Sequence, residues 1–156
     1  MFNKSKGDLL MKKYLLTACL ASALAGCASV PMGSSRQDAA LKTFTVPPDK
    51  AAIYVYRNEA FGGTVKMGVS VDGKPIGQTA AHTYLYEQVS PGEHVVTSKA
   101  ENTDSIKVDA RPGSLVFIWQ EVKMGFLFAR NKLHLVSTTQ GEAGVKEARL
   151  AASSGE

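Results

Sequence analysis

From Lys50 onward, short runs of alternating apolar and polar residues are separated by turn residues about every eight to twelve positions. In residues 65–71, four apolar side chains at every second position share one face, while Lys66 and Ser70 lie on the other. This alternation is typical of an antiparallel strand with one buried face. The Asp-Gly pair at 72–73 follows directly and favours a tight hairpin turn. The same pattern predicts strands at residues 51–57, 65–71, 76–79, 83–89, 94–99, 105–110, 115–119 and 132–136.

The spacing of these strands predicts an all-β fold, an antiparallel β-sandwich over residues 50–137. The period changes in residues 138–156. There Thr139 and Glu142 have the spacing of a helix capping box, and good helix formers continue to Ala152. We therefore expect a short C-terminal helix and a tail after the sandwich.

The front of the chain has the pattern of a signal peptide. An apolar run over residues 14–23 follows the basic pair at 12–13, and small residues close it. The run is too short for a permanent transmembrane helix, which needs about 20 apolar residues. We predict a signal peptide over residues 1–26.

The residues at 24–27, Leu-Ala-Gly-Cys, resemble the lipobox of bacterial lipoproteins at every position. The resemblance implies cleavage after Gly26, a diacylglycerol on the sulfur of Cys27 and, usually, an acyl chain on the new amine. Two or three acyl chains give stable membrane anchoring without a transmembrane helix. Ala28 stands where the family's signal for inner-membrane retention is aspartate, which implies an outer-membrane protein. We expect the domain to lie on the periplasmic face of that membrane.

Residues 27–49 show no sustained period and end in Pro47-Pro48, so we predict the lipidated cysteine followed by a flexible tether. A brief helix over residues 38–42 is compatible with this stretch.

Composition fits one ordinary globular domain: the chain has 156 residues, 44% hydrophobic, and only 2 cysteines, too few for a disulfide framework. The formal net charge of +4 is concentrated at the front. Residues 1–26 hold four lysines and one aspartate, which leaves 14 basic and 13 acidic side chains in the rest of the chain. Without a basic cluster, we expect no nucleic-acid binding.

The predicted domain, residues 50–137, resembles the DUF2846 family, bacterial and often lipoprotein domains with a PEGA-like β architecture and no assigned biochemistry. The resemblance rests on turn and strand sequences, which imply a fold and no reaction. They lie at 53–57, 71–74 with Gly77, 89–94 and 133–136.

Motifs for chemistry are weak. A serine-hydrolase elbow has no match beyond Gly68-Val69-Ser70, which lacks the second glycine and lies within a predicted strand. Metal binding needs three or four ligands that converge on one point. A pair of catalytic carboxylates for glycoside hydrolysis needs a fixed separation in space, which the spacing along the chain does not give. We predict no catalytic residue, metal or cofactor. The side chains considered are His82, His94, His134, Glu87, Glu93 and Glu121.

Two groups are candidate binding residues. Tyr54, Tyr56 and Arg57 either pack at the end of a strand or form a patch that binds a sugar or peptide by stacking. Phe126 and Phe128 belong to an apolar segment flanked by basic residues, which either folds over the core or contacts a protein partner or a membrane surface.

Three function classes remain. We expect a noncatalytic envelope lipoprotein that is held at the membrane by its lipid anchor and whose β-domain binds or scaffolds an envelope protein. A cell-wall glycan or peptide binding module is the alternative, and an unrecognised periplasmic hydrolase ranks last because no nucleophile or acid pair stands out.

Overall fold

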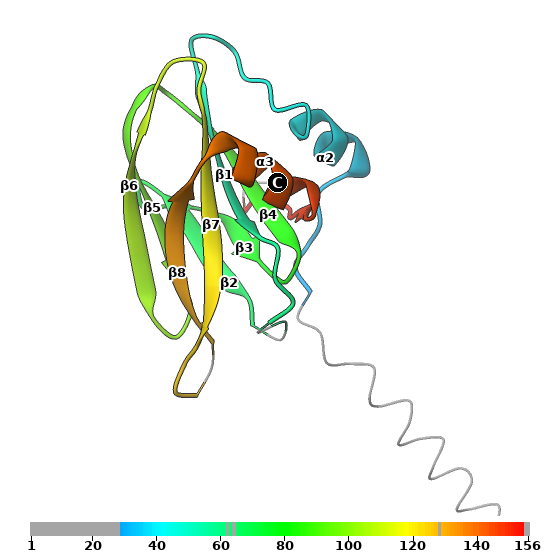
Figure 1. Ribbon diagram of the computed structural model, residues 1–156, viewed down its shortest axis with the longest axis vertical. Helices are drawn as coiled ribbons and strands as arrows, with labels where there is room; N and C mark the ends of the chain where they lie inside the picture. Colours follow the sequence, from blue (N-terminus) through cyan, green and yellow to red (C-terminus); the bar gives the residue numbers. More distant parts are fainter. Residues whose placement is uncertain (1–28, 62, 64, 128, 155–156) are drawn as a thin grey trace, which may run out of the picture.

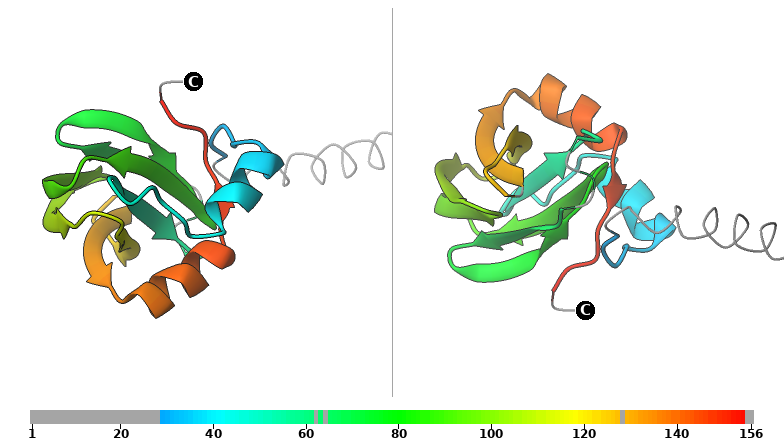
Figure 2. Two further views of the ribbon diagram at one scale, coloured as in Figure 1. Left: turned by 90° about the horizontal axis from the view of Figure 1, so that it is seen from above. Right: turned by 90° about the horizontal axis from the view of Figure 1, so that it is seen from below.

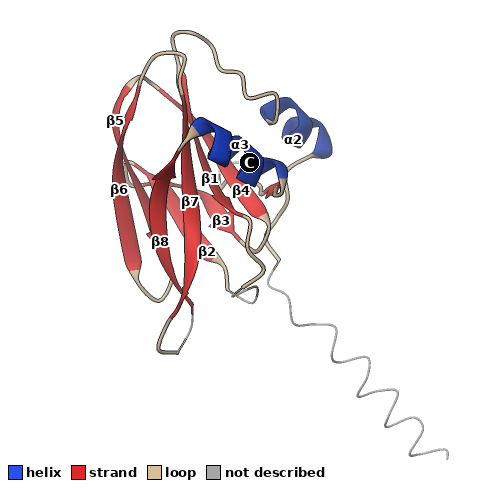
Figure 3. Ribbon diagram, viewed as in Figure 1, coloured by secondary structure: helices blue, strands red, loops and turns tan. Residues whose placement is uncertain are grey.

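The computed structural model describes residues 29–61, 63, 65–127 and 129–154. The signal peptide and Cys27 lie outside these residues. Two sheets face each other, as the sequence predicts (Figure 1, Figure 3). One sheet has the order β8 (Ala129–Val136), β7 (Leu115–Met124), β1 (Ala51–Arg57), β4 (Thr83–Val89) and β9 (Arg149–Leu150). The other has the order β3 (Lys74–Thr79), β2 (Met67–Val71), β5 (Gly92–Lys99) and β6 (Thr103–Ala110).

Most strand pairs are antiparallel, but β1 pairs with β7, and β4 with β9, in parallel. β1 lies in the middle of its sheet and is buried along its whole length, because apolar clusters cover both of its faces. Ile53 and Val55 enter the core between the two sheets. Tyr54 and Tyr56 enter a second apolar cluster on the outer face of the same sheet.

Helix α3 (Thr138–Lys146) covers this outer face. The end-on views in Figure 2 show it outside the two sheets. Its N-cap is Ser137, whose side chain accepts a hydrogen bond from the Gln140 N–H, so the predicted capping box at Thr139 is wrong by two positions. The helix also ends earlier than predicted, because the chain turns into β9 and pairs with β4.

The predicted tether needs correcting from Val30 onward. Val30 is 6% exposed and packs in the core between the sheets. Helix α2 (Ser35–Leu41) follows, and the carbonyl of Leu41 accepts a hydrogen bond from the Tyr54 hydroxyl at 2.8 Å. The side chain of Asp38 accepts the N–H of Leu150 at 2.9 Å. This segment is therefore part of the folded domain.

Within the described ranges, neither helix has the length and apolar character needed to cross a bilayer.

Candidate functional site

The most exposed apolar side chains lie where β7 turns into β8. The two strands pair as far as Met124 and Ala129, several residues beyond the predicted strand ends, so the apolar segment is the tip of a hairpin. Met124, Phe126 and Leu127 are 82, 91 and 75% exposed, and we call these three side chains the apolar tip. Of the two alternatives for this segment, folded over the core or exposed, the structure favours exposure for Phe126. Phe128 lies outside the described residues.

The apolar tip is fixed by Glu101 from the turn between β5 and β6. The two carboxylate oxygens of Glu101 accept the backbone N–H groups of Phe126 and Leu127, each at 3.0 Å. The N–H of Glu101 in turn donates to the carbonyl of Ala129 at 3.3 Å. The two turns belong to different sheets, so this clamp fixes the backbone of the hairpin turn before any partner binds.

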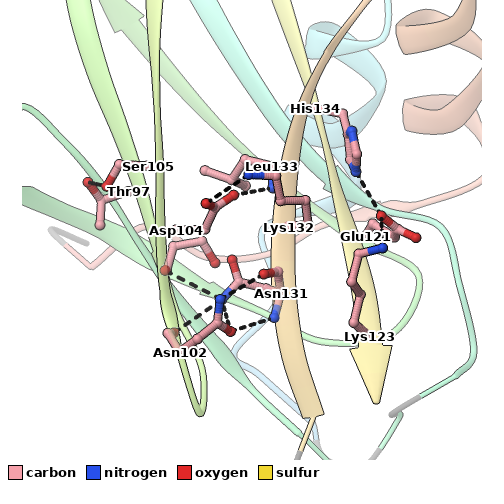
Figure 4. A network of polar contacts seen from close by, with 11 residues as sticks. Thr97, Asn102, Asp104, Ser105, Glu121, Lys123, Asn131, Lys132, Leu133 and His134 are labelled. Carbon is pink, nitrogen blue, oxygen red and sulfur yellow. Dashed lines mark hydrogen bonds and ion pairs between the residues drawn. The ribbon is translucent and has the colours of Figure 1, made fainter. Parts of the chain in front are cut away.

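Farther from the tip, Asn102 in the turn between β5 and β6 and Asp104 on β6 bind the backbone of β8 (Figure 4). Asn102 and Asn131 exchange two hydrogen bonds, from the Asn131 N–H to Asn102 Oδ1 at 2.8 Å and from Asn102 Nδ2 to the Asn131 carbonyl at 2.9 Å. Asp104 accepts the N–H of Leu133 at 2.7 Å and pairs with Lys132 at 3.2 Å. Burial raises the pKa of Asp104, but these bonds outweigh it and hold that pKa below its ordinary value. The network closes the sandwich on this side.

Basic side chains stand next to the apolar tip, as the sequence suggests. Lys123 and Lys132 are paired with Glu121 and Asp104, at 3.1 and 3.2 Å. Arg130 is exposed and has no ion pair within the described part of the chain.

Removing the clamp tests whether Glu101 orders the apolar tip. We expect Glu101→Ala to speed amide hydrogen exchange at Phe126 and Leu127 by at least tenfold, because both N–H groups lose their acceptor. The thermal melt should change little, since the tip contributes no buried apolar side chain. Unchanged exchange at both amides would show that the turn is ordered without Glu101. Lys107→Ala, at an exposed pair far from the tip on β6, is the matched control.

Tyr54, Tyr56 and Arg57 are buried and do not form the predicted surface patch. These side chains are 0, 2 and 0% exposed, so their faces are closed to a sugar or peptide. Burial raises the pKa of both tyrosines. The Arg57 guanidinium donates to the carbonyls of Val65 at 2.8 Å and Phe61 at 3.0 Å. It therefore orders the loop between β1 and β2.

The histidines and acids considered for metal or catalysis are spread over both sheets. His134 lies 2.7 Å from Glu121, while Glu87 and Glu93 pair with Lys74 and Lys107. Among the residues that the structure describes, no three potential ligands come together as a metal site.

His94 and Asp72 form a pair near the opposite end of β5. His94 Nδ1 lies 2.6 Å from Asp72 Oδ2, and Nε2 lies 2.7 Å from the Ser90 carbonyl. Burial lowers the pKa of His94, but these two bonds outweigh it and raise that pKa above its ordinary value. The bond to His94 lowers the pKa of Asp72.

This pair predicts a pH-dependent stability. Its contribution is complete between about pH 4 and 6.5, and it is lost as pH rises through the raised pKa of His94 or falls through the lowered pKa of Asp72. Asp72→Asn should therefore cost up to about 1 kcal/mol near pH 5.5 and less near pH 9. Asparagine keeps an acceptor for the Val95 N–H and tolerates the positive φ of 52°. Urea unfolding at the two pH values measures this, and equal losses would contradict it.

A pocket of about 260 Å³, which no pattern in the sequence predicts, lies between α3 and the five-stranded sheet. Its lining residues are Tyr56, Asn58, Trp119, Gln140, Ala143, Gly144 and Glu147. Trp119 Nε1 is buried and has no hydrogen-bond partner among the described residues. Asn58 Nδ2 donates to Glu147 at 2.8 Å. No motif marks this set, because α3 brings Gln140 and Glu147 next to strands that precede it by some twenty to ninety positions.

A protein of Haemophilus influenzae (strain ATCC 51907 / DSM 11121 / KW20 / Rd), described as an uncharacterized protein, is 29% identical over 132 residues, which cover 83% of this chain and 79% of the relative. No solved structure matches the chain. The model of the family described as "Protein of unknown function (DUF2846)" matches residues 47–131. Since this match spans more than half of the chain, the protein belongs to the DUF2846 family.

Proposed function

We propose that the protein is a lipoprotein, acylated at Cys27 and held at the periplasmic face of the bacterial outer membrane. Its β-domain is a noncatalytic module that binds or scaffolds another component of the cell envelope. The apolar tip is the surface through which it does so.

One observation carries this proposal: Met124, Phe126 and Leu127 are exposed, yet their turn is fixed by the Glu101 carboxylate. A loop with no role outside the fold gains nothing from presenting large apolar side chains to water. Preorganisation lowers the entropy lost on binding, which suits a docking surface.

The noncatalytic character is supported by how the candidate side chains are used. The acids considered for catalysis pair with lysines or a histidine, and Arg57 binds backbone carbonyls inside the fold.

Crosslinking in intact cells tests the docking role. With the full-length chain, we expect a crosslinked envelope component that is lost in Phe126→Asp/Leu127→Asp. It should be retained in Leu135→Asp, the matched control, because Leu135 is also exposed, at 57%, but lies far along β8 from the tip. Equal crosslinking in all three chains, with equal melts, would overturn the proposal.

The pocket beneath α3 favours a second candidate function, binding of a cell-wall glycan or peptide. Trp119, Asn58 and Gln140 line the same pocket, and the two side-chain amides suit a ligand rich in hydroxyl or amide oxygens. Trp119 is the only tryptophan in the chain, so its fluorescence reports this site directly. A saturable change on adding soluble peptidoglycan fragments, abolished in Gln140→Ala, would support this function, and an unchanged spectrum would exclude it.

A further inference from the structure

Exposed apolar side chains gather at one end of the sandwich. Among the described residues, six large apolar side chains are exposed, and four of them lie at this end. Three form the apolar tip, and the fourth is Phe61, which is 53% exposed and lies in the loop after β1. Because β1 and β7 run in parallel, with Tyr56 paired to Trp119, the segments that follow the two strands leave the sheet at the same end. We call this surface the apolar end.

The segments of the apolar end are tied to the body of the domain. Glu101 binds the hairpin turn, and Arg57 binds the carbonyls of Phe61 and Val65. A buried cation and a clamping carboxylate thus hold two neighbouring turns in place. In Figure 1 the turn between β7 and β8 is the lowest part of the described chain and extends beyond the ends of the other strands.

The apolar end also carries unpaired positive charge. Lys66 directly precedes β2, and Lys99 ends β5, where it pairs with Gly68 of β2. Arg130 follows the tip on β8. All three are exposed, and within the described ranges none has a carboxylate partner. The carboxylates nearby are engaged: Asp104 and Glu121 with lysines, Glu101 with the tip, while Glu59 lies near the buried charge of Arg57. Exposed apolar side chains surrounded by basic ones favour binding at the interface of an anionic bilayer.

The chain length before the domain limits where a bilayer can lie. Val30 is buried in the core, and Cys27 precedes it by three residues. A fully extended chain gains at most about 3.5 Å per residue, so acyl chains on Cys27 would keep Val30 within roughly 10 Å of the lipid surface. In Figure 1 the start of the described chain lies in the lower half of the view. The turn between β7 and β8 and the loop after β1 lie in the same half.

We infer that the apolar end rests on the bilayer that holds the lipid anchor, with Phe126 and Leu127 at the boundary between headgroups and acyl chains. This inference rests on the proposed acylation of Cys27. It assigns the lipid surface, and not a protein, as the component that the apolar tip contacts. The sandwich would then stand on the membrane in a fixed orientation, with its opposite end, near His94, directed into the periplasm.

A single thiol tests this contact. An acylated mature chain has no free cysteine, because Cys19 leaves with the signal peptide and Cys27 becomes a thioether. Phe126→Cys therefore gives one site for a polarity-sensitive fluorophore on the full-length lipoprotein, purified from membranes. The protein is reconstituted into phosphatidylcholine–phosphatidylglycerol vesicles that contain spin-labelled acyl chains. Leu135→Cys, labelled in the same way, is the matched control.

We expect the label at position 126 to be quenched at least fivefold more strongly than the label at 135, with a blue-shifted emission. The parent chain, with neither substitution, should float with the vesicles and take up no label. Flotation with equal quenching at both positions would overturn the lipid contact alone and leave the tip to a protein partner. A parent chain that does not float, or that reacts as a free thiol, would overturn the proposed anchor itself.

Discussion

Arg57→Met is expected to lower the free energy of unfolding by about 3 kcal/mol, among the largest effects of any single substitution outside the apolar core. Methionine fills much of the same volume, so the loss does not come from a cavity. It comes from the carbonyls of Phe61 and Val65, which would lose a charged donor inside the fold. A hydrogen bond to a charged group contributes about 1.5–3 kcal/mol.

Removing the buried charge works in the opposite direction, because desolvation lowers the pKa of Arg57 and makes the charged side chain costly to bury. We expect the two lost carbonyl bonds to outweigh that gain. Arg57→Lys, which keeps the charge but lacks the planar fork, should fall between the parent and Arg57→Met. Urea unfolding measures all three chains. A methionine variant as stable as the parent would mean that the loop after β1 is satisfied without Arg57.

Gly141→Ala and Gly144→Ala are each expected to lower the free energy of unfolding by about 2 kcal/mol. Both glycines face the sheet from α3, where an added methyl group would overlap the ring of Phe117 or of Tyr56. Alanine favours an isolated helix over glycine by about 1 kcal/mol, so propensity alone predicts the opposite sign. The sign of the change therefore shows whether α3 is pressed against the sheet.

Gly68→Ala is the matched control for these two glycines. Apart from its two neighbours in the chain, no residue has an atom within 4 Å of an added methyl group there, so we expect no loss of stability. If the two helix variants matched this control in thermal and urea unfolding, α3 would not be packed closely on Phe117 and Tyr56.

The alternation of side chains predicted the strands because it depends only on local geometry. It also placed Ile53 and Val55 on one face of β1 and the tyrosines on the other. The alternation could not show that the second face of β1 is also buried. Tyr54 and Tyr56 on that face are buried by α2 and α3, which come from distant parts of the chain. An exposed aromatic face and a covered one have the same sequence pattern.

The predicted tether failed for a related reason. Leu41, Phe44 and Val46 have no regular period, yet they pack against the outer cluster of the five-stranded sheet. The spacing of Asp38 and Lys42, which form an ion pair at 3.0 Å, is the local signal that a helix is present. Similarly, the apolar segment at 124–127 was visible in the sequence, but the Glu101 clamp depends on how the two sheets are stacked.

Intact-protein mass spectrometry of the chain isolated from outer membranes shows whether this DUF2846 domain is anchored through lipid on Cys27. We expect a mature N-terminus at Cys27 that carries the mass of a diacylglycerol thioether, with or without an amide-linked acyl chain. A chain that retains residues 1–26, or one that begins elsewhere with an unmodified Cys27 thiol, would contradict it.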